Sequence, residues 1–215
     1  MSSRSDIGEV YTSLGAHSAL IEYSDNTYSF DAFDSIGSPG YDFLISASGS
    51  SSDGRVHALY LWFPAIYDET AFRADFARFA PAQIITTYGP PDRVWLQAFR
   101  DAPYHWYQMY LFYDRLGFAL RYSLTAERTE EATFRFCPAA SDSRAFDEIA
   151  LAVRAQTGIA SLESLLELEP LDVLPPIITL REAANLEPSD LAQGINNSGQ
   201  DYCFTAPEAA FPPIP

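Results

Sequence analysis

The chain has 215 residues, enough for one large domain or two small ones with a sizeable core. Its 29 acidic side chains outnumber its 13 basic ones, all of which are Arg, and the formal net charge is -16. This balance argues against nucleic acid and anionic membrane surfaces as partners, because both bind through basic patches.

The first 64 residues predict a short helix followed by strands. Residues 6–14 are the helix candidate, and residues 24–40 have the Gly, Pro and Asp content of a loop, with at most an edge strand at residues 27–30. Residues 41–47 and 55–63 have the pattern of two strands of a hairpin joined by a polar turn. Both faces of the second strand are largely apolar, so we expect it to be central in a sheet.

Residues 65–123 predict helices and then three strands. Phe72, Phe76 and Phe79 fall at the spacing of one helical stripe. Pro81 suits the first turn of a second short helix, and Gly89 suits the left-handed position that ends it. Strands are predicted over residues 92–99, 104–113 and 116–123, with a tight turn at residues 114–115.

An internal repeat is predicted within residues 1–123. Residues 10–21 align without gaps on residues 84–95, and apolar, hydroxyl and Gly positions coincide. Together with the order of elements, this predicts an α+β fold of two repeated units, each a helix plus three strands, at about residues 6–63 and 69–123. The helices would pack on one face of an antiparallel sheet. Chance similarity over about a dozen residues is the alternative.

The last third, residues 124–215, is predicted to be a helical and irregular segment that wraps the repeat region. It contains a strand over residues 132–137, an acidic helix over residues 144–156 and a helix candidate over residues 161–167. Thr179 and Glu182 have the spacing of a capping box that opens a helix over residues 179–185, and Pro188 opens one more short helix. The Pro-rich tail from residue 206 onward shows no helix or strand pattern.

Residues 6–123 resemble the small repeat unit of the β-lactamase-inhibitor-protein-like (BLIP-like) and SmpA/OmlA lipoprotein families. The resemblance lies in the element order, the Gly-Pro-Pro-Asp turn at residues 89–92 and the Tyr-rich strand at residues 104–113. Secreted bacterial proteins with similar units also exist. The resemblance covers residues 6–123 and implies a layered α/β unit that binds proteins at the cell envelope. The chain departs from the lipoprotein pattern because it shows no leader and no N-terminal lipidation Cys. It also contains no apolar run long enough for a transmembrane segment. The resemblance implies an extracellular or membrane-anchored location, and the missing leader leaves a cytoplasmic one as the alternative.

The two cysteines, Cys137 and Cys203, each lie at the end of a predicted element, where pairing is geometrically easy. A disulfide between them would hold the C-terminal segment, and the resemblance to secreted proteins favours it. Two separate buried thiols are the alternative.

The sequence contains no residue pattern typical of a catalytic, metal-binding or cofactor-binding site. No pair among the three histidines has the spacing of a metal-binding helix. His105 lies among aromatic residues with Asp101 near it, so an enzyme with a dispersed active site around this pair is an alternative function. The acidic residues of the loop at residues 25–42 fail the EF-hand spacing, and we expect no metal there.

The aromatic side chains of the predicted strands are the strongest indication of function. Trp106, Gln108, Tyr110 and Phe112 share one face of their strand, with Trp95 beside them. Tyr and Trp supply most of the energy at protein interfaces, so we expect this face to bind a protein partner. The alternative is that the C-terminal segment covers it and these residues are core. We therefore expect a non-catalytic envelope or secreted binding module; a structural domain of a larger assembly is the other alternative.

Overall fold

The computed structural model describes residues 18–22, 27–36, 41–50, 55–64, 74, 76–99, 105–129, 131–140, 146–154, 161–166 and 175–211, with only the backbone for residues 18–57, 63 and 64. The helix expected at residues 6–14 lies outside these ranges. So does most of the first copy of the expected repeat, at residues 10–21. The two-unit repeat therefore stays a prediction.

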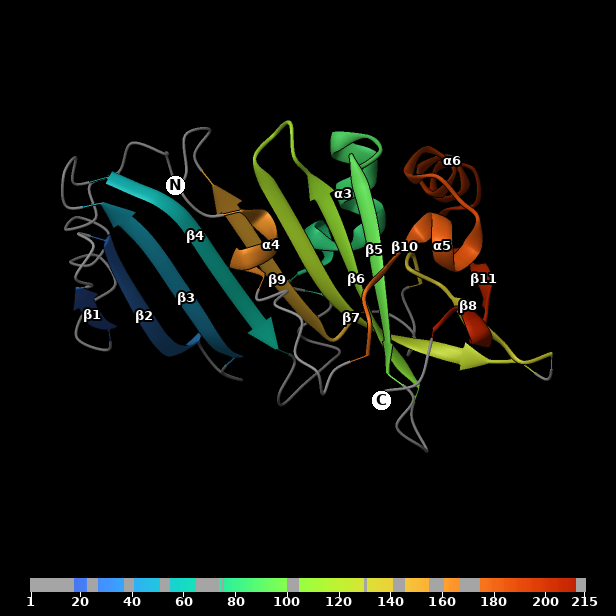
Figure 1. The fold of residues 1–215 in the computed structure, drawn as a ribbon, viewed down its shortest axis with the longest axis horizontal. Coiled ribbons are helices and arrows are strands. Elements are labelled where there is room, and N and C mark those ends of the chain that lie inside the picture. Colours follow the sequence, from blue (N-terminus) through green and yellow to red (C-terminus); the bar gives the residue numbers. More distant parts are fainter. Residues whose placement is uncertain are drawn as a thin grey trace. The chain divides into compact units, whose positions relative to one another are not determined.

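The fold is α+β, and every strand pair whose register is described is antiparallel. The strands and helices follow the chain in the order shown in Figure 1. The strands are β1 (Ser18–Glu22), β2 (Thr27–Ile36), β3 (Tyr41–Ser50), β4 (Arg55–Pro64), β5 (Arg93–Phe99), β6 (Trp106–Tyr113), β7 (Phe118–Arg128), β8 (Thr133–Phe136), β9 (Glu148–Arg154), β10 (Ile178–Thr179) and β11 (Phe204–Pro207). The α-helices are α3 (Pro81–Tyr88), α4 (Leu162–Leu165), α5 (Leu180–Ala184) and α6 (Pro188–Ser198), and the 3-10 helices are η2 (Ala77–Phe79), η3 (Gly199–Asp201) and η4 (Glu208–Ala210).

The chain divides into two compact units. Unit 1 consists of Met1–Asp68, Asp114–Leu120 and Ile149–Glu169, and unit 2 consists of Glu69–Tyr113, Arg121–Glu148 and Pro170–Pro215. Each unit is thus assembled from segments that are far apart in the sequence.

Unit 1 is built on the sheet order β1-β2-β3-β4-β9. Strand β2 is longer than the edge strand expected at residues 27–30, because all ten of its residues pair with β3, from Thr27 opposite Ser50 to Ile36 opposite Tyr41. The prediction of a loop is therefore wrong for residues 31–36, while residues 37–40 lie outside the described ranges. Asp and Ser have low strand propensity, but cross-strand pairing over ten residues outweighs such local preferences.

Strand β9 replaces the helix that the sequence predicted over residues 144–156. Ile149, Ala150 and Ala152 are buried, so both faces of this strand contribute to packing. A short apolar run that is buried on both faces has no period of two, and its Ala and Leu residues also favour a helix. Local pattern could not distinguish the two structures here.

Unit 2 has the sheet order β7-β6-β5-β10, and β8 pairs with both β7 and β11. Strand β7 continues to Arg128, beyond the expected end at residue 123, because its last residues pair with β8. The tail also differs from expectation, since residues 204–207 form β11 against β8. Pro207 is tolerated because β11 pairs with β8 alone among the described strands and is therefore an edge strand.

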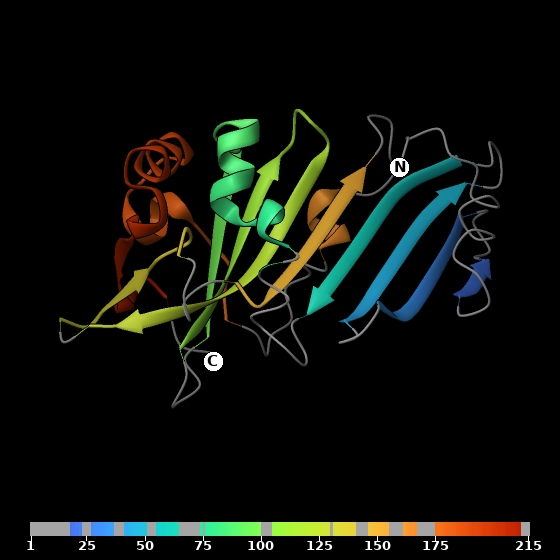
Figure 2. The same cartoon turned by 180° about the vertical axis from the view of Figure 1, so that it is seen from behind.

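Helix α3 lies over one face of the unit 2 sheet, as Figure 2 shows. It begins with Pro81 at its first turn and ends at Gly89, whose φ of 79° lies in the region that favours glycine. Ile84 and Ile85 of α3 are buried, and the Tyr113 hydroxyl donates to the Gly89 carbonyl at 3.0 Å. The predicted helix stop and the start of β5 after it are therefore confirmed.

Candidate binding face

Strands β5 and β6 present two different faces, which we assign from their register. Tyr107 and Tyr113 belong to one face, on which the Tyr113 hydroxyl bonds to Gly89 at the end of α3. The other face, called the aromatic face below, is formed by alternate residues of both strands. Its members are Arg93, Trp95, Gln97 and Phe99 of β5, and Trp106, Gln108, Tyr110 and Phe112 of β6.

The five residues expected to bind a partner all lie on the aromatic face, but they differ in exposure. Trp95, Trp106 and Gln108 are partly exposed. Tyr110 is only 1% exposed and Phe112 is fully buried. Direct contact with a partner is therefore open to the first three, whereas Tyr110 and Phe112 form the base beneath them.

Ring packing fixes the two ends of the aromatic face. At one end the Arg93 guanidinium carbon lies 4.2 Å from the centre of the Phe112 ring and 4.9 Å from that of Trp95. At the other end Trp106 stacks on Phe99 with 3.7 Å between ring centres and 1° between planes. Cation–π and stacking contacts of this kind restrict side-chain rotation, so both indoles are held in place before any partner arrives.

A buried polar network lies between these two ends. Gln97, opposite Gln108 across the strand pair, donates from Nε2 to the Pro175 carbonyl at 2.6 Å. The Tyr110 hydroxyl lies 2.9 Å from Gln97 Oε1 and 2.5 Å from Gln108 Oε1, and its single proton can be donated to one of them at a time. The network thereby orients the partly exposed Gln108 carboxamide.

Gln97 and Pro175 were not found by reasoning from the sequence. Gln97 is 4% exposed and follows Trp95 on the same face of β5. A buried Gln on a strand indicates a hydrogen-bonded partner, since a buried amide without one is costly. A buried Gln does not, however, indicate which residue it bonds to. The contact with Pro175 spans 78 positions and depends on the pairing of β10 with the edge of β5.

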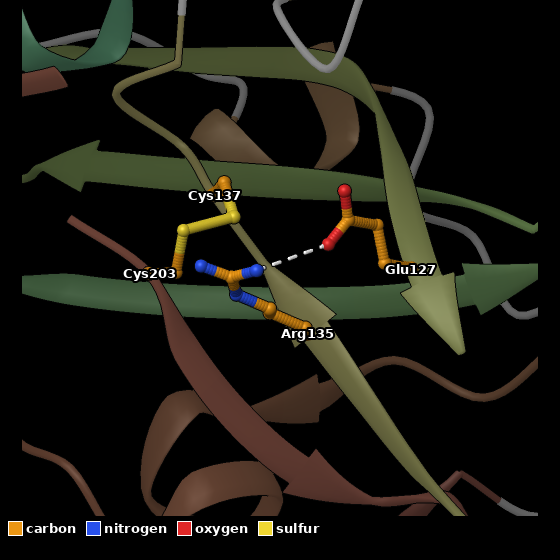
Figure 3. Close-up of a disulfide and its surroundings, with 4 residues drawn as sticks. All are labelled: Glu127, Arg135, Cys137 and Cys203. Atoms are coloured by element: carbon orange, nitrogen blue, oxygen red, sulfur yellow. Dashed lines mark hydrogen bonds and ion pairs between the residues drawn. A yellow bond between two sulfur atoms is a disulfide. The ribbon is translucent and has the colours of Figure 1, made fainter. Parts of the chain in front are cut away.

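The predicted disulfide between Cys137 and Cys203 is present. Cys137 directly follows β8 and Cys203 directly precedes β11, so the bond lies at the end of the ladder that these two strands form. Figure 3 shows it beside the ion pair of Arg135 and Glu127. It links segments 66 positions apart.

The alternative site at His105 and Asp101 is only half described, because Asp101 lies outside the described residues. His105 is partly exposed, but its Nδ1 atom is buried without a hydrogen-bond partner. Its ring lies 5.6 Å from that of Phe134. In the described ranges no group of three or more His, Cys, Asp or Glu could hold a metal ion.

Searches of protein-family models, of curated proteins and of solved structures found no match for this chain. The resemblance to the BLIP-like and SmpA/OmlA families therefore stays a prediction. Among the helices that the structure describes, none has the length and apolar character needed to cross a membrane.

Proposed function

We propose that this chain is a non-catalytic binding module of the cell envelope or of a secreted protein, and that a protein partner binds its aromatic face. The observation that carries this proposal is the row of partly exposed Trp95, Gln108 and Trp106 above a buried aromatic base. Trp and Arg are the residue types that dominate binding energy at protein interfaces.

Preorganisation of the aromatic face supports the proposal. Binding costs less when the contacting side chains are already immobilised in the free protein. Here Arg93 packs over Trp95, Phe99 stacks on Trp106, and Tyr110 holds Gln108. Three contacting side chains would lose little conformational freedom when a partner binds.

The disulfide supports the proposed location. Disulfides persist in oxidising compartments such as the periplasm and the extracellular space, and they are rare in the cytosol. The Cys137–Cys203 bond therefore favours an exported protein. The finer assignments, which are a BLIP-like tandem repeat and a lipoprotein-like anchor, belong to the same proposal and rest on the sequence resemblance alone.

The chemistry of the aromatic face suggests what the partner presents. Indole and guanidinium groups are hydrogen-bond donors that cannot accept. Trp95 and Trp106 place indole donors on the aromatic face, on either side of the Gln108 carboxamide. We expect a partner segment that combines apolar side chains with carbonyl or carboxylate acceptors.

A comparison of matched variants tests this proposal. The wild type, Gln108→Arg and Gln193→Arg would be used to capture proteins from an envelope and secreted fraction of the source cells. Gln193 is exposed on α6 and is not part of the aromatic face. Gln193→Arg therefore makes the same substitution outside the proposed binding surface. We expect one protein to be retained by the wild type and Gln193→Arg but lost with Gln108→Arg. Equal capture by all three folded proteins would contradict the proposal.

A further inference from the structure

The disulfide lies at the end of the β8–β11 ladder, one face of which is exposed. Phe134 and Phe136 of β8 are buried, whereas Arg135 between them is exposed. Thr205, the cross-strand neighbour of Arg135, is exposed as well. A molecule in solution can therefore approach this face of the ladder.

The two sulfur-bearing residues are not equally accessible. Cys137 is 1% exposed, whereas Cys203 is partly exposed. Thiol–disulfide exchange requires a thiolate to reach one sulfur in line with the bond that breaks. The accessible end of this disulfide is Cys203, which leaves Cys137 as the departing sulfur.

A cation lies next to the departing sulfur. Arg135 precedes Cys137 by two residues, which in extended chain separates their Cα atoms by about 7 Å. Figure 3 shows its side chain directed toward the disulfide, with Glu127 paired to it at 3.4 Å. A guanidinium beside a cysteine stabilises the thiolate form and so makes it a better leaving group.

We propose that the Cys137–Cys203 bond is a redox-sensitive link, opened by a dithiol reductant that attacks Cys203, with Arg135 stabilising the departing Cys137 thiolate. The reductant thiolate forms a bond to Cys203 Sγ, the Cys137–Cys203 bond breaks, and its electron pair leaves on Cys137, which then takes a proton from water. The second thiol of the reductant, as its thiolate, displaces Cys203. The reductant ends as a disulfide, and both cysteines end as thiols.

Reduction would loosen β11 and the turn after it without unfolding unit 2. Phe204, Ala206 and Phe211 are buried, and this apolar packing does not depend on the disulfide. Strand β11 also keeps its backbone pairing with β8. The reduced state would therefore open locally and more often, which exposes Phe134 and Phe136 transiently.

Trapping with a monothiol identifies the sulfur that is attacked. The folded, oxidised protein would be treated with 2-mercaptoethanol near neutral pH, quenched with iodoacetamide and mapped by peptide mass spectrometry. We expect the mixed disulfide on Cys203 and the alkyl group on Cys137. A mixed disulfide mainly on Cys137, or no reaction until denaturant is added, would overturn the proposal.

Charge variants test the role of Arg135. Reduction by dithiothreitol should slow roughly three- to tenfold in Arg135→Gln, as expected for losing a unit charge at this range near a surface. It should accelerate in Glu127→Gln, where the neutralising carboxylate is gone. Arg128→Gln is the control, because Arg128 lies in the same hairpin but pairs with Glu208 and neighbours Phe134 on the opposite face. Equal rates in Arg135→Gln and Arg128→Gln, with melting temperatures matched, would refute the role of Arg135.

Discussion

At the scale of single residues, Tyr107 carries a buried hydroxyl without a partner. The side chain is fully buried, the hydroxyl has no hydrogen bond, and burial raises the pKa of Tyr107 well above its usual value. Tyr107→Phe removes the unsatisfied group and keeps the ring contact with Phe136. We expect unfolding in urea to show a gain of about 1 kcal/mol.

The matched control for this change is Tyr122→Phe. Tyr122 is equally buried, but its hydroxyl donates to the Phe79 carbonyl at 2.7 Å. The same substitution there should cost about 1 kcal/mol, because a hydrogen bond is lost. An equal loss of stability in both variants would contradict this prediction, because it would mean that the Tyr107 hydroxyl has a hydrogen-bond partner in solution.

The network under the aromatic face makes a second residue-scale prediction. Gln97→Leu removes the donor to Pro175 and one acceptor of Tyr110 in a buried site, so we expect a loss of about 2 kcal/mol. Gln108→Leu should cost less, because Gln108 is partly exposed and Tyr110 keeps its bond to Gln97. Urea unfolding of the two single variants and the double variant measures this. Equal losses would show that Gln97 does not anchor the network.

At the scale of elements, helix α5 depends on its capping box. Thr179 accepts from the Glu182 amide at 3.1 Å, and the Glu182 carboxylate accepts from the Thr179 amide at 2.8 Å. Thr179→Ala should therefore cost about 1 kcal/mol in thermal unfolding. Ser189→Ala changes an exposed hydroxyl in α6 and should have little effect. A loss shared by both variants would point to general helix propensity instead of the cap.

The same cap predicts a pH dependence. Hydrogen bonds from the Thr179 amide and hydroxyl lower the pKa of Glu182 below its usual value. A lowered carboxyl pKa stabilises the folded state above the unfolded value of about 4.3, and the contribution disappears as pH falls through the folded value. The difference in melting temperature between the wild type and Glu182→Ala should therefore be largest at neutral pH and vanish in acid.

Elements bounded by Gly, Pro or a cap could be predicted from sequence, because their signals are local. Pro81 and Gly89 delimit α3, and Thr179 with Glu182 opens α5, as expected. Strand β9 could not be predicted, because only pairing with distant strands makes residues 148–154 extended.

The candidate site also combines features that local sequence predicts with features that depend on distant segments. Strand alternation places Trp106, Gln108, Tyr110 and Phe112 on one face, and the register of β5 and β6 agrees. Alternation does not tell which of these side chains become covered. Tyr110 and Phe112 are buried by tertiary packing, and Gln97 gains its partner from a segment 78 positions away.

At the scale of the whole molecule, the net charge of -16 should make stability depend on salt. Exposed ion pairs such as Arg181–Glu187 and Arg135–Glu127 contribute little. Repulsion among excess carboxylates opposes the compact state, and salt screens it. Melting temperature should therefore rise between low salt and roughly 0.5 M NaCl, where charges interact over only a few Å. A fall would mean that the ion pairs outweigh the repulsion.

The disulfide gives the last prediction at this scale. Replacing both cysteines by Ala opens a loop whose ends are 66 positions apart, which in the chain-entropy model costs about 4 kcal/mol. This effect acts on the unfolded chain, so the urea m-value should also increase, because the unlinked chain exposes more surface when it unfolds. Local packing predicts something different: Cys137 is buried, and loss of its contacts alone would lower stability by a smaller amount without changing the m-value.

Urea unfolding of the oxidised wild type, the reduced wild type and the double variant separates these two causes. If the reduced wild type and the double variant agree, the loss comes from the cross-link; if only the double variant is destabilised, it comes from packing.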